Sequence, residues 1–175
     1  LKGVIDVVYN PILTSLCYEA KKRNIPYICG LEMLVGQAVS AIEFFTNKFI
    51  DSSVIQKISK DIFFDKRNIV LIGMPSCGKT TLGKKLSKEL GYDYIDLDKM
   101  IVHKTNKTIP QIFEESGETG FRKIESEICL EVSKCNHTVI SCGGGIIKNE
   151  INMKALALNG LIIYIKRDVD KLLVG

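Results

Sequence analysis

Several features that mark whole classes of proteins are absent from this sequence. It contains no run of about 18 apolar residues, and no basic stretch precedes an apolar one at its N-terminus, so neither a membrane span nor a secretory signal is indicated. The six cysteines form no C-x-x-C pair, and we interpret them as reduced thiols. We therefore expect a cytoplasmic protein.

The sequence also has little excess of charge of either sign. The net charge is +4 and no block of five like charges occurs. The sequence therefore gives only a weak indication of the basic patch that is typical of nucleic-acid-binding proteins. His103 and His137 have no cysteine or histidine partner at metal-binding spacing, and we interpret both as surface or strand-edge residues. A mildly basic protein suits anionic small molecules equally well. We expect small-molecule partners, with no nucleic acid and no membrane.

The most specific stretch that is present runs from residue 68 to residue 81. Its glycines, lysine and threonine fit the pattern G-x-x-x-x-G-K-[ST]. In such a loop backbone N–H groups surround phosphate oxygens, the lysine neutralises their charge, and the hydroxyl binds Mg²⁺. The alternative is a glycine turn that binds no ligand. The residues expected to contact a nucleotide are Gly73, Pro75, Ser76, Cys77, Gly78, Lys79, Thr80 and Thr81.

The segments around this loop predict an α/β fold. The apolar, β-branched run at 69–72 is typical of a central parallel strand. Further strands are expected at 94–98, 137–141 and 161–165. Between them we expect helices after the loop, at 98–104, after Pro110, from about 118 to 134 and near 149–158. This alternation predicts a parallel sheet with right-handed crossovers.

The first fifty residues are interpreted as a terminal piece of a domain. We expect a strand at 4–8, a helix from Thr14 to about Arg23, a connector at 24–30 and a helix at 31–45. One strand with two helices offers no sheet to cover them, which argues against a complete domain. Residues 51–67 are expected to be a linker, with a short helix after Asp51, before a second domain at 68–175. The apolar face of the second helix is assigned to Leu34, Ala38, Ala41, Ile42 and Phe45.

Two carboxylates lie two residues apart at the end of the second expected strand. If the chain is still extended there, Asp96 and Asp98 project to the same side, at the sheet edge where ligands bind. Asp96 would then belong to the Mg²⁺ shell. Asp98 would align an acceptor hydroxyl and take up its proton. The alternative is that Asp98 only caps the following helix.

An arginine near the start of a helix is a further candidate. Arg122 and Glu125 would lie one turn apart, and arginine can hold a substrate carboxylate with two parallel hydrogen bonds. The alternative is an ordinary surface ion pair between these two side chains, which spacing alone favours.

Three consecutive glycines, Gly143, Gly144 and Gly145, follow the third expected strand. Each costs backbone entropy on folding and adds no packing. Such a run suits a place where the backbone approaches a ligand closely. A plain tight turn is the alternative.

From residue 68 onward the chain resembles shikimate kinase. The likeness lies in the loop at 73–81, the pair Asp96 and Asp98, the stretch 117–125 and the turn 143–145, which occur in that family's order and approximate spacing. The resemblance implies an incomplete P-loop kinase fold, with three layers arranged α/β/α, and transfer of the γ-phosphate of ATP to the 3-hydroxyl of shikimate.

The same resemblance implies a role for each site residue. Lys79 and Thr80 would lie at the phosphates and Mg²⁺, with Asp96 near the metal. Lys79 and Asp98 would be the catalytic residues. Asp98, Arg122 and the turn 143–145 would hold shikimate, and Arg122 would pair with its carboxylate.

The first fifty residues resemble the C-terminal end of shikimate dehydrogenase, through the segments 6–11, 14–16, 30–34 and 37–38. In that family the residues matching Tyr9 and Gln37 lie at the substrate, and those matching Gly30 and Met33 lie near the nicotinamide. From the residues alone, Met33 and Gln37 could equally be a core methionine beside an exposed amide. Together the two likenesses imply a fused dehydrogenase-kinase. NADP would serve only the complete dehydrogenase part, whose catalytic pair would precede Leu1.

Two other functions stay open. One is a different small-molecule P-loop kinase, such as a gluconate kinase, which would not need Arg122; the other is a non-catalytic ATP-binding remnant. A guanine-nucleotide switch is disfavoured, because Asn106 and Lys107 are not followed by the aspartate of N-K-x-D. The lid of the kinase family would follow Gly175. We therefore expect this stretch alone to bind phosphate but to turn over slowly or not at all.

Overall fold

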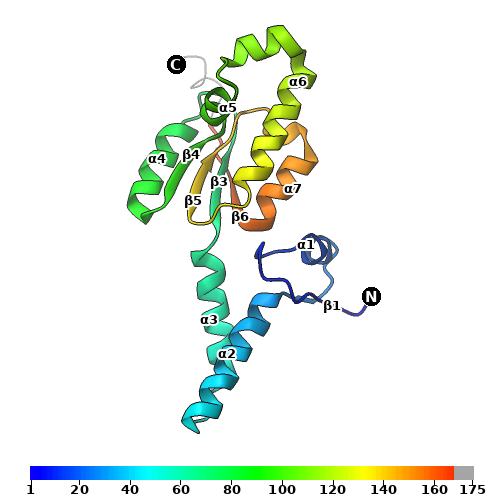
Figure 1. Cartoon of the computed structure of the whole chain (residues 1–175), viewed down its shortest axis with the longest axis vertical. Helices are drawn as coiled ribbons and strands as arrows, with labels where there is room; N and C mark the ends of the chain where they lie inside the picture. Colours follow the sequence, from blue (N-terminus) through cyan, green and yellow to red (C-terminus); the bar gives the residue numbers. More distant parts are fainter. Residues whose placement is uncertain (168–175) are drawn as a thin grey trace. The chain divides into compact units, whose positions relative to one another are not determined.

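The computed structural model describes residues 1–167. They belong to two compact units, which divide between Arg67 and Asn68. Figure 1 shows the chain coloured along its sequence.

The second unit is built on a parallel sheet. Its strands within the described residues are β3 (Asn68–Ile72), β4 (Asp93–Asp96), β5 (Thr138–Ser141) and β6 (Gly160–Tyr164). They lie in the order β4-β5-β3-β6, and each neighbouring pair is parallel. All their carboxyl ends therefore meet at one edge of the sheet, as expected for an α/β fold.

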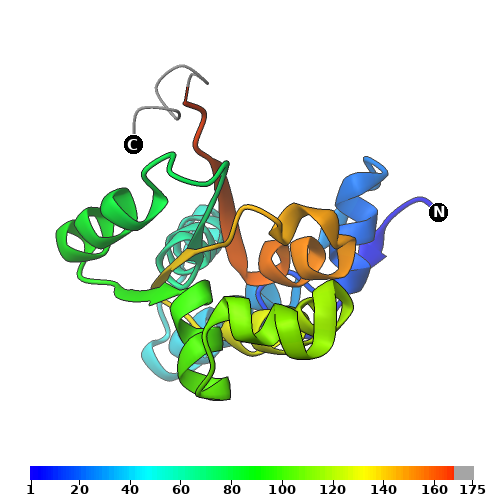
Figure 2. The ribbon, with the colours of Figure 1, turned by 90° about the horizontal axis from the view of Figure 1, so that it is seen from above.

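Helices cover both faces of this sheet. Figure 2 shows α4 (Lys79–Leu90) on one side and α6 (Ile109–Val132) with α7 (Glu150–Asn159) on the other. The apolar core of the unit includes buried side chains from the sheet, from α5 (Leu97–Thr105) and from α6 and α7; its fully buried members include Val70, Leu97, Ile101, Ile112, Ile140 and Leu156. The predicted three-layer arrangement and its parallel sheet are thus confirmed.

Helix α6 contains the break that the sequence predicts. Thr108 caps its start in a capping box with Gln111, and a proline occupies the first turn. At Gly117 the backbone leaves the helix, with φ 66° and ψ −173°. Glycine tolerates this conformation without steric cost, so the helix before Gly117 and the long helix after it are separate segments.

The first unit contains a strand that the sequence analysis missed. β1 (Val4–Ile5) pairs in parallel with β2 (Tyr27–Ile28), which lies in the expected connector at 24–30. Between them α1 (Ser15–Lys22) begins as predicted at Thr14, whose hydroxyl accepts a hydrogen bond from the N–H of Cys17 at 3.2 Å. The statement that this unit has a single strand was wrong.

The expected linker is helical. Asp51 caps α3 (Ser52–Asp65), a helix of 14 residues. Its Ile55, Ile62 and Phe63 pack with α2 (Gly30–Thr46) and α1 in the core of the first unit. The segment 51–67 is therefore part of the packed structure of this unit.

The buried face of α2 also differs from the prediction. Leu31, Val35 and Val39 are buried, whereas Leu34 and Phe45 are 41% and 83% exposed. Both rows repeat with helical spacing, and hydrophobic periodicity alone does not tell which one meets the core. None of the helices within residues 1–167 is long and apolar enough to cross a membrane.

A buried asparagine connects two strands of the main sheet by hydrogen bonds, at the edge where the strands begin. The side chain of Asn68 is 1% exposed. Its Nδ2 donates to the carbonyl of Cys135 at 2.6 Å, and its Oδ1 accepts from the N–H of Thr138 at 3.1 Å. The residue therefore joins the start of β3 to the turn that leads into β5.

We predict that Asn68→Ala lowers the free energy of unfolding by about 1–3 kcal/mol, because it leaves buried backbone groups unpaired. Urea unfolding followed by circular dichroism measures this change. Lys123→Ala, at an exposed position of α6, is the control and should change stability by no more than about 0.5 kcal/mol. Equal stability of the two variants would contradict the prediction.

Candidate active site

The glycine-rich loop connects β3 to α4 at the carboxyl edge of the sheet. Positive φ angles occur at Gly73 (151°), Ser76 (59°) and Gly78 (96°). A side chain at Gly73 would also meet the carbonyl oxygen of Ile165 at 2.6 Å. Gly78 precedes α4 and offers no side-chain cap to its first N–H groups. These groups are therefore left for an anion, as the motif predicts.

Lys79 lies against this loop. Its side chain is 9% exposed, and its Nζ donates to the carbonyls of Gly73 at 2.9 Å and Met74 at 2.7 Å. The Sγ of Cys77, which is also buried, lies 3.7 Å from the same Nζ. The ammonium group is thus held inside the loop that would receive a phosphate.

A second cation reaches the loop from the end of β6. Nη1 of Arg167 donates to the carbonyl of Ser76 at 3.2 Å. Ser76 has the left-handed conformation that non-glycine residues rarely adopt, so this contact helps to hold a strained peptide. The two residues lie 91 positions apart, and no motif in the sequence indicated the contact.

A carboxylate and a hydroxyl meet beside the loop. Oγ1 of Thr80 donates to Oδ2 of Asp96 at 3.2 Å. Within residues 1–167 no group of three His, Cys, Asp or Glu side chains could hold a metal ion. Mg²⁺ commonly takes one or two protein oxygens together with water and phosphate oxygens. Thr80 and Asp96 fit that donor set, and a metal here would need the oxygens of a nucleotide.

The geometry predicted for the two aspartates was wrong. β4 ends at Asp96, whose Oδ1 accepts from the N–H of Lys99 at 3.3 Å and so caps α5. Asp98 lies in the first turn of that helix, neither in an extended strand nor at the cap. The helix begins one residue earlier than expected, at Leu97, because Asp96 supplies the cap. Both carboxylates nevertheless remain at the same edge of the sheet.

Asp98 is partly buried among charged groups. Burial raises the pKa of its carboxyl above the ordinary value, and the neighbouring charges of Asp96 and Glu125 raise this pKa further. The cations Lys79 and Arg122 act in the opposite direction, with smaller effect. A carboxylate of this kind binds a proton more readily than an exposed one.

The three consecutive glycines lie against three different parts of the site. A Cβ at Gly143 would be 2.8 Å from Oδ1 of Asp98, one at Gly144 would be 2.9 Å from Cδ of Pro75, and one at Gly145 would be 2.5 Å from Nη2 of Arg122. None of the three has a positive φ. Glycine at these positions allows the backbone to approach the neighbouring groups closely. A tight turn that needs positive φ does not explain the three glycines.

Arg122 is held by two glutamates of its own helix. Its Nη1 donates to Oε2 of Glu125 at 2.8 Å, and the side chain of Glu125 is 2% exposed. On the other edge, Nη2 and Nε lie 3.3 and 3.4 Å from Oε1 of Glu118, which is 58% exposed and also contacts Lys148. The pair with Glu125 exists, but it is not the surface ion pair of the alternative interpretation.

An open pocket adjoins Asp98. It has a volume of about 460 Å³ and is lined by Asp98, Lys99, Val102, His103 and Ile109. Its position places space for a small molecule next to the carboxylate. His103 thus belongs to the wall of this pocket, although the sequence indicated only a surface residue.

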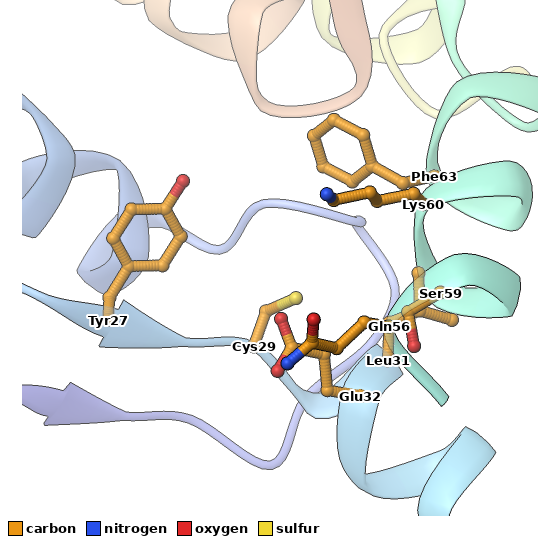
Figure 3. A pocket seen from close by; sticks show the side chains of 8 residues that line it. All are labelled: Tyr27, Cys29, Leu31, Glu32, Gln56, Ser59, Lys60 and Phe63. Carbon is orange, nitrogen blue, oxygen red and sulfur yellow. The ribbon is translucent and has the colours of Figure 1, made fainter. Parts of the chain in front are cut away.

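The residues expected from the dehydrogenase resemblance do not line the pocket found in the first unit. That pocket, of about 230 Å³, lies among β2, α2 and α3 (Figure 3), and its lining includes Tyr27, Glu32, Ser59 and Lys60. Tyr9 and Met33 are 52% and 42% exposed, and Gln37 is exposed as well. The alternative of a core methionine at Met33 was therefore wrong.

Gly30 is the exception among these four residues, because it is buried at a close backbone approach. Its N–H donates to the carbonyl of Val8 at 3.2 Å, and a Cβ there would meet the carbonyl oxygen of Val7 at 2.1 Å. Only glycine fits this contact between α2 and the segment that follows β1.

Comparison with known proteins connects the second unit to one family. The family model described as shikimate kinase matches residues 75–174. Shikimate kinases of Clostridium botulinum and Methylococcus capsulatus are 50% and 42% identical over 108 and 107 residues, which cover 62% and 61% of this chain. These stretches are 65% and 60% of the relatives' own length, so the chain spans less than two thirds of them.

Solved structures give the same result. A shikimate kinase from Acinetobacter baumannii in complex with shikimate is 37% identical, with a TM-score of 0.62, over 65% of this chain and 64% of that one. A shikimate kinase from Aquifex aeolicus is 36% identical, with a TM-score of 0.57, over 61% of this chain and 63% of that one.

The raised pKa of Asp98 leads to a prediction about stability. If the pKa of a carboxyl is higher in the folded than in the unfolded state, the protein becomes less stable as pH rises from the unfolded pKa to the folded one. We predict that Asp98→Asn, which cannot ionise, is at least as stable as the unmodified protein at pH 7. Its advantage should shrink below the ordinary pKa of aspartate.

Urea midpoints measured from pH 3.5 to pH 8 test this prediction. Asp93→Asn, at an exposed position of β4, serves as the control. A deficit in the stability of Asp98→Asn that grows as pH rises would show that the ionised carboxylate stabilises the fold, contrary to the prediction.

Proposed function

Because this chain belongs to the shikimate kinase family, we propose that the protein transfers the γ-phosphate of ATP to the 3-hydroxyl of shikimate, releasing ADP and shikimate 3-phosphate. One observation carries this proposal. The turn 143–145 touches Pro75 of the phosphate loop, Asp98 and Arg122 at successive residues. The loop that would hold the nucleotide, the carboxylate that would accept a proton and the arginine that would bind a carboxylate therefore lie together around this turn.

The nucleotide would bind in the loop between β3 and α4. The N-terminal N–H groups of α4 and the ammonium of Lys79 would hold the β- and γ-phosphates. Thr80 and Asp96 would hold Mg²⁺ together with phosphate oxygens, and the bound metal would neutralise charge on the transferring group. Lys79 would have to leave the carbonyls of Gly73 and Met74 in order to reach the phosphate.

Asp98 would act on the acceptor. It lies at the pocket of about 460 Å³, which has room for a small ring compound. The raised pKa of its carboxyl suits a group that must take up the proton of a hydroxyl during transfer. The backbone of the turn approaches this carboxylate closely, because a Cβ at Gly143 would lie 2.8 Å from its Oδ1.

Arg122 would bind the carboxylate of the acceptor through its outer edge. Glu125 is buried and holds Nη1 from within, so it fixes the orientation of the guanidinium. Glu118 is exposed and makes longer contacts with Nε and Nη2. An acceptor carboxylate that displaced Glu118 would form the two parallel hydrogen bonds for which arginine is suited.

The first unit is assigned separately. We propose that residues 1–50 are the C-terminal end of a shikimate dehydrogenase-like domain fused to the kinase. The motif matches at Tyr9, Gly30, Met33 and Gln37 support this assignment, and so does the close approach at Gly30. NADP would bind only with the remainder of that domain. We also propose a cytoplasmic location for the fused protein.

The test of the proposed function is an acceptor comparison with the fused protein, because residues 1–175 alone are expected to turn over slowly or not at all. ADP release from Mg·ATP is followed in the presence of shikimate, the methyl ester of shikimate or gluconate. We predict rapid ADP release with shikimate, and a rate at limiting substrate that is about 100-fold lower with the ester, which lacks the charge that Arg122 would bind.

Two results would overturn the proposal. Faster release with gluconate than with shikimate would identify a different small-molecule kinase. Tight binding of ADP without phosphorylation of any of the three acceptors would identify a non-catalytic nucleotide-binding protein.

A further inference from the structure

A tyrosine lies next to the candidate metal residues Thr80 and Asp96. Tyr94 lies on β4, two residues before Asp96 and on the same face of the strand. Its hydroxyl donates to Oδ2 of Asp96 at 3.4 Å. The side chains of Thr80 and Ser141 also lie near this hydroxyl, and both act to lower the pKa of Tyr94. It therefore lies among three polar groups at the carboxyl edge of the sheet.

The ring of Tyr94 is held in place by a glycine on the neighbouring helix. A Cβ at Gly83, which is buried on α4, would lie 2.7 Å from Cε2 of Tyr94. Helix α4 therefore presents bare backbone to the ring. β4 pairs with β5 in parallel, and this pairing sets Asp96 beside Ser141. The strand and the helix together fix where the hydroxyl lies.

Each oxygen of the Asp96 carboxylate has its own partners. Oδ1 accepts from the N–H of Lys99 and caps α5, whereas Oδ2 accepts from Thr80 and Tyr94. Of the two donors to Oδ2, only Thr80 belongs to the phosphate-loop motif. If Thr80 turns toward a metal ion, Tyr94 remains to hold this oxygen.

We propose that the Tyr94 hydroxyl is a positioning group that orients Asp96 and Thr80 for the Mg²⁺ that accompanies the nucleotide. The inference rests on the proposed function only as far as Mg·nucleotide binding. Groups that hydrogen-bond to metal-binding side chains orient them, and their removal typically costs about 10- to 100-fold in metal affinity. Phenylalanine at this position would keep the packing against Gly83 and lose only the hydroxyl.

The experiment measures the binding of ADP by isothermal titration, once with excess Mg²⁺ and once with EDTA, for the intact protein and for Tyr94→Phe. We expect Tyr94→Phe to lose about tenfold in ADP affinity with Mg²⁺ and to keep its affinity in EDTA. Electron paramagnetic resonance of Mn²⁺ with ADP should show the same loss. Tyr92→Phe, just before the amino end of the same strand, is the matched control and should bind as the unmodified protein does.

A second variant keeps the proposal testable if Tyr94→Phe does not fold. Gly83→Ala pushes a methyl group into the ring, so it should weaken Mg·ADP binding in the same direction, and thermal melts report whether each variant is folded. Equal Mg·ADP affinity of Tyr94→Phe and the unmodified protein would overturn the proposal, as would an equal loss in EDTA.

Failure of the proposed function gives a different pattern. If no acceptor is phosphorylated but Tyr94→Phe still loses affinity only with Mg²⁺, the positioning role stands and the assignment of shikimate fails. ADP affinity of the unmodified protein that does not depend on Mg²⁺ would overturn the positioning role itself.

Discussion

The close approach of the backbone at Gly143, Gly144 and Gly145 is the constraint on which the candidate active site depends. Each glycine leaves room for a group on a different element, namely the phosphate loop, the start of α5 and the guanidinium on α6. Any larger side chain would force one of these groups away. The turn after β5 therefore decides how the nucleotide side and the acceptor side of the site lie relative to each other.

This arrangement gathers charge in a partly buried place, which works against stability. Burial and the neighbouring carboxylates raise the pKa of Asp98, and Glu125 is almost fully buried with Arg122 as its partner. Buried ion pairs often add little net stability. Their value here is geometric, because Glu125 fixes one edge of the guanidinium, whereas the other edge contacts the exposed Glu118, which an acceptor would displace.

The sequence predicted most of the fold of the second unit and most residues that meet at the candidate site, because both depend on local signals. The phosphate loop, the break at Gly117 and the parallel strands are encoded in short segments. The hydrogen bonds of Tyr94 and the contact of Arg167 with the loop could not be predicted, since they join residues that no motif connects. The prediction that Asp98 lies in extended chain was wrong, because Asp96 caps the helix and so sets its start before Asp98.

The measurement that tests the central claim most directly is the affinity of Gly145→Ala for shikimate and for Mg·ADP, by isothermal titration. Gly145 has φ −88° and ψ −4°, which alanine adopts without strain, so the added methyl group acts only through its contact with Arg122. The account predicts a loss of about tenfold or more in shikimate affinity, because small displacements of positioning groups are costly, with Mg·ADP affinity retained. Unchanged shikimate affinity in this variant would contradict the account.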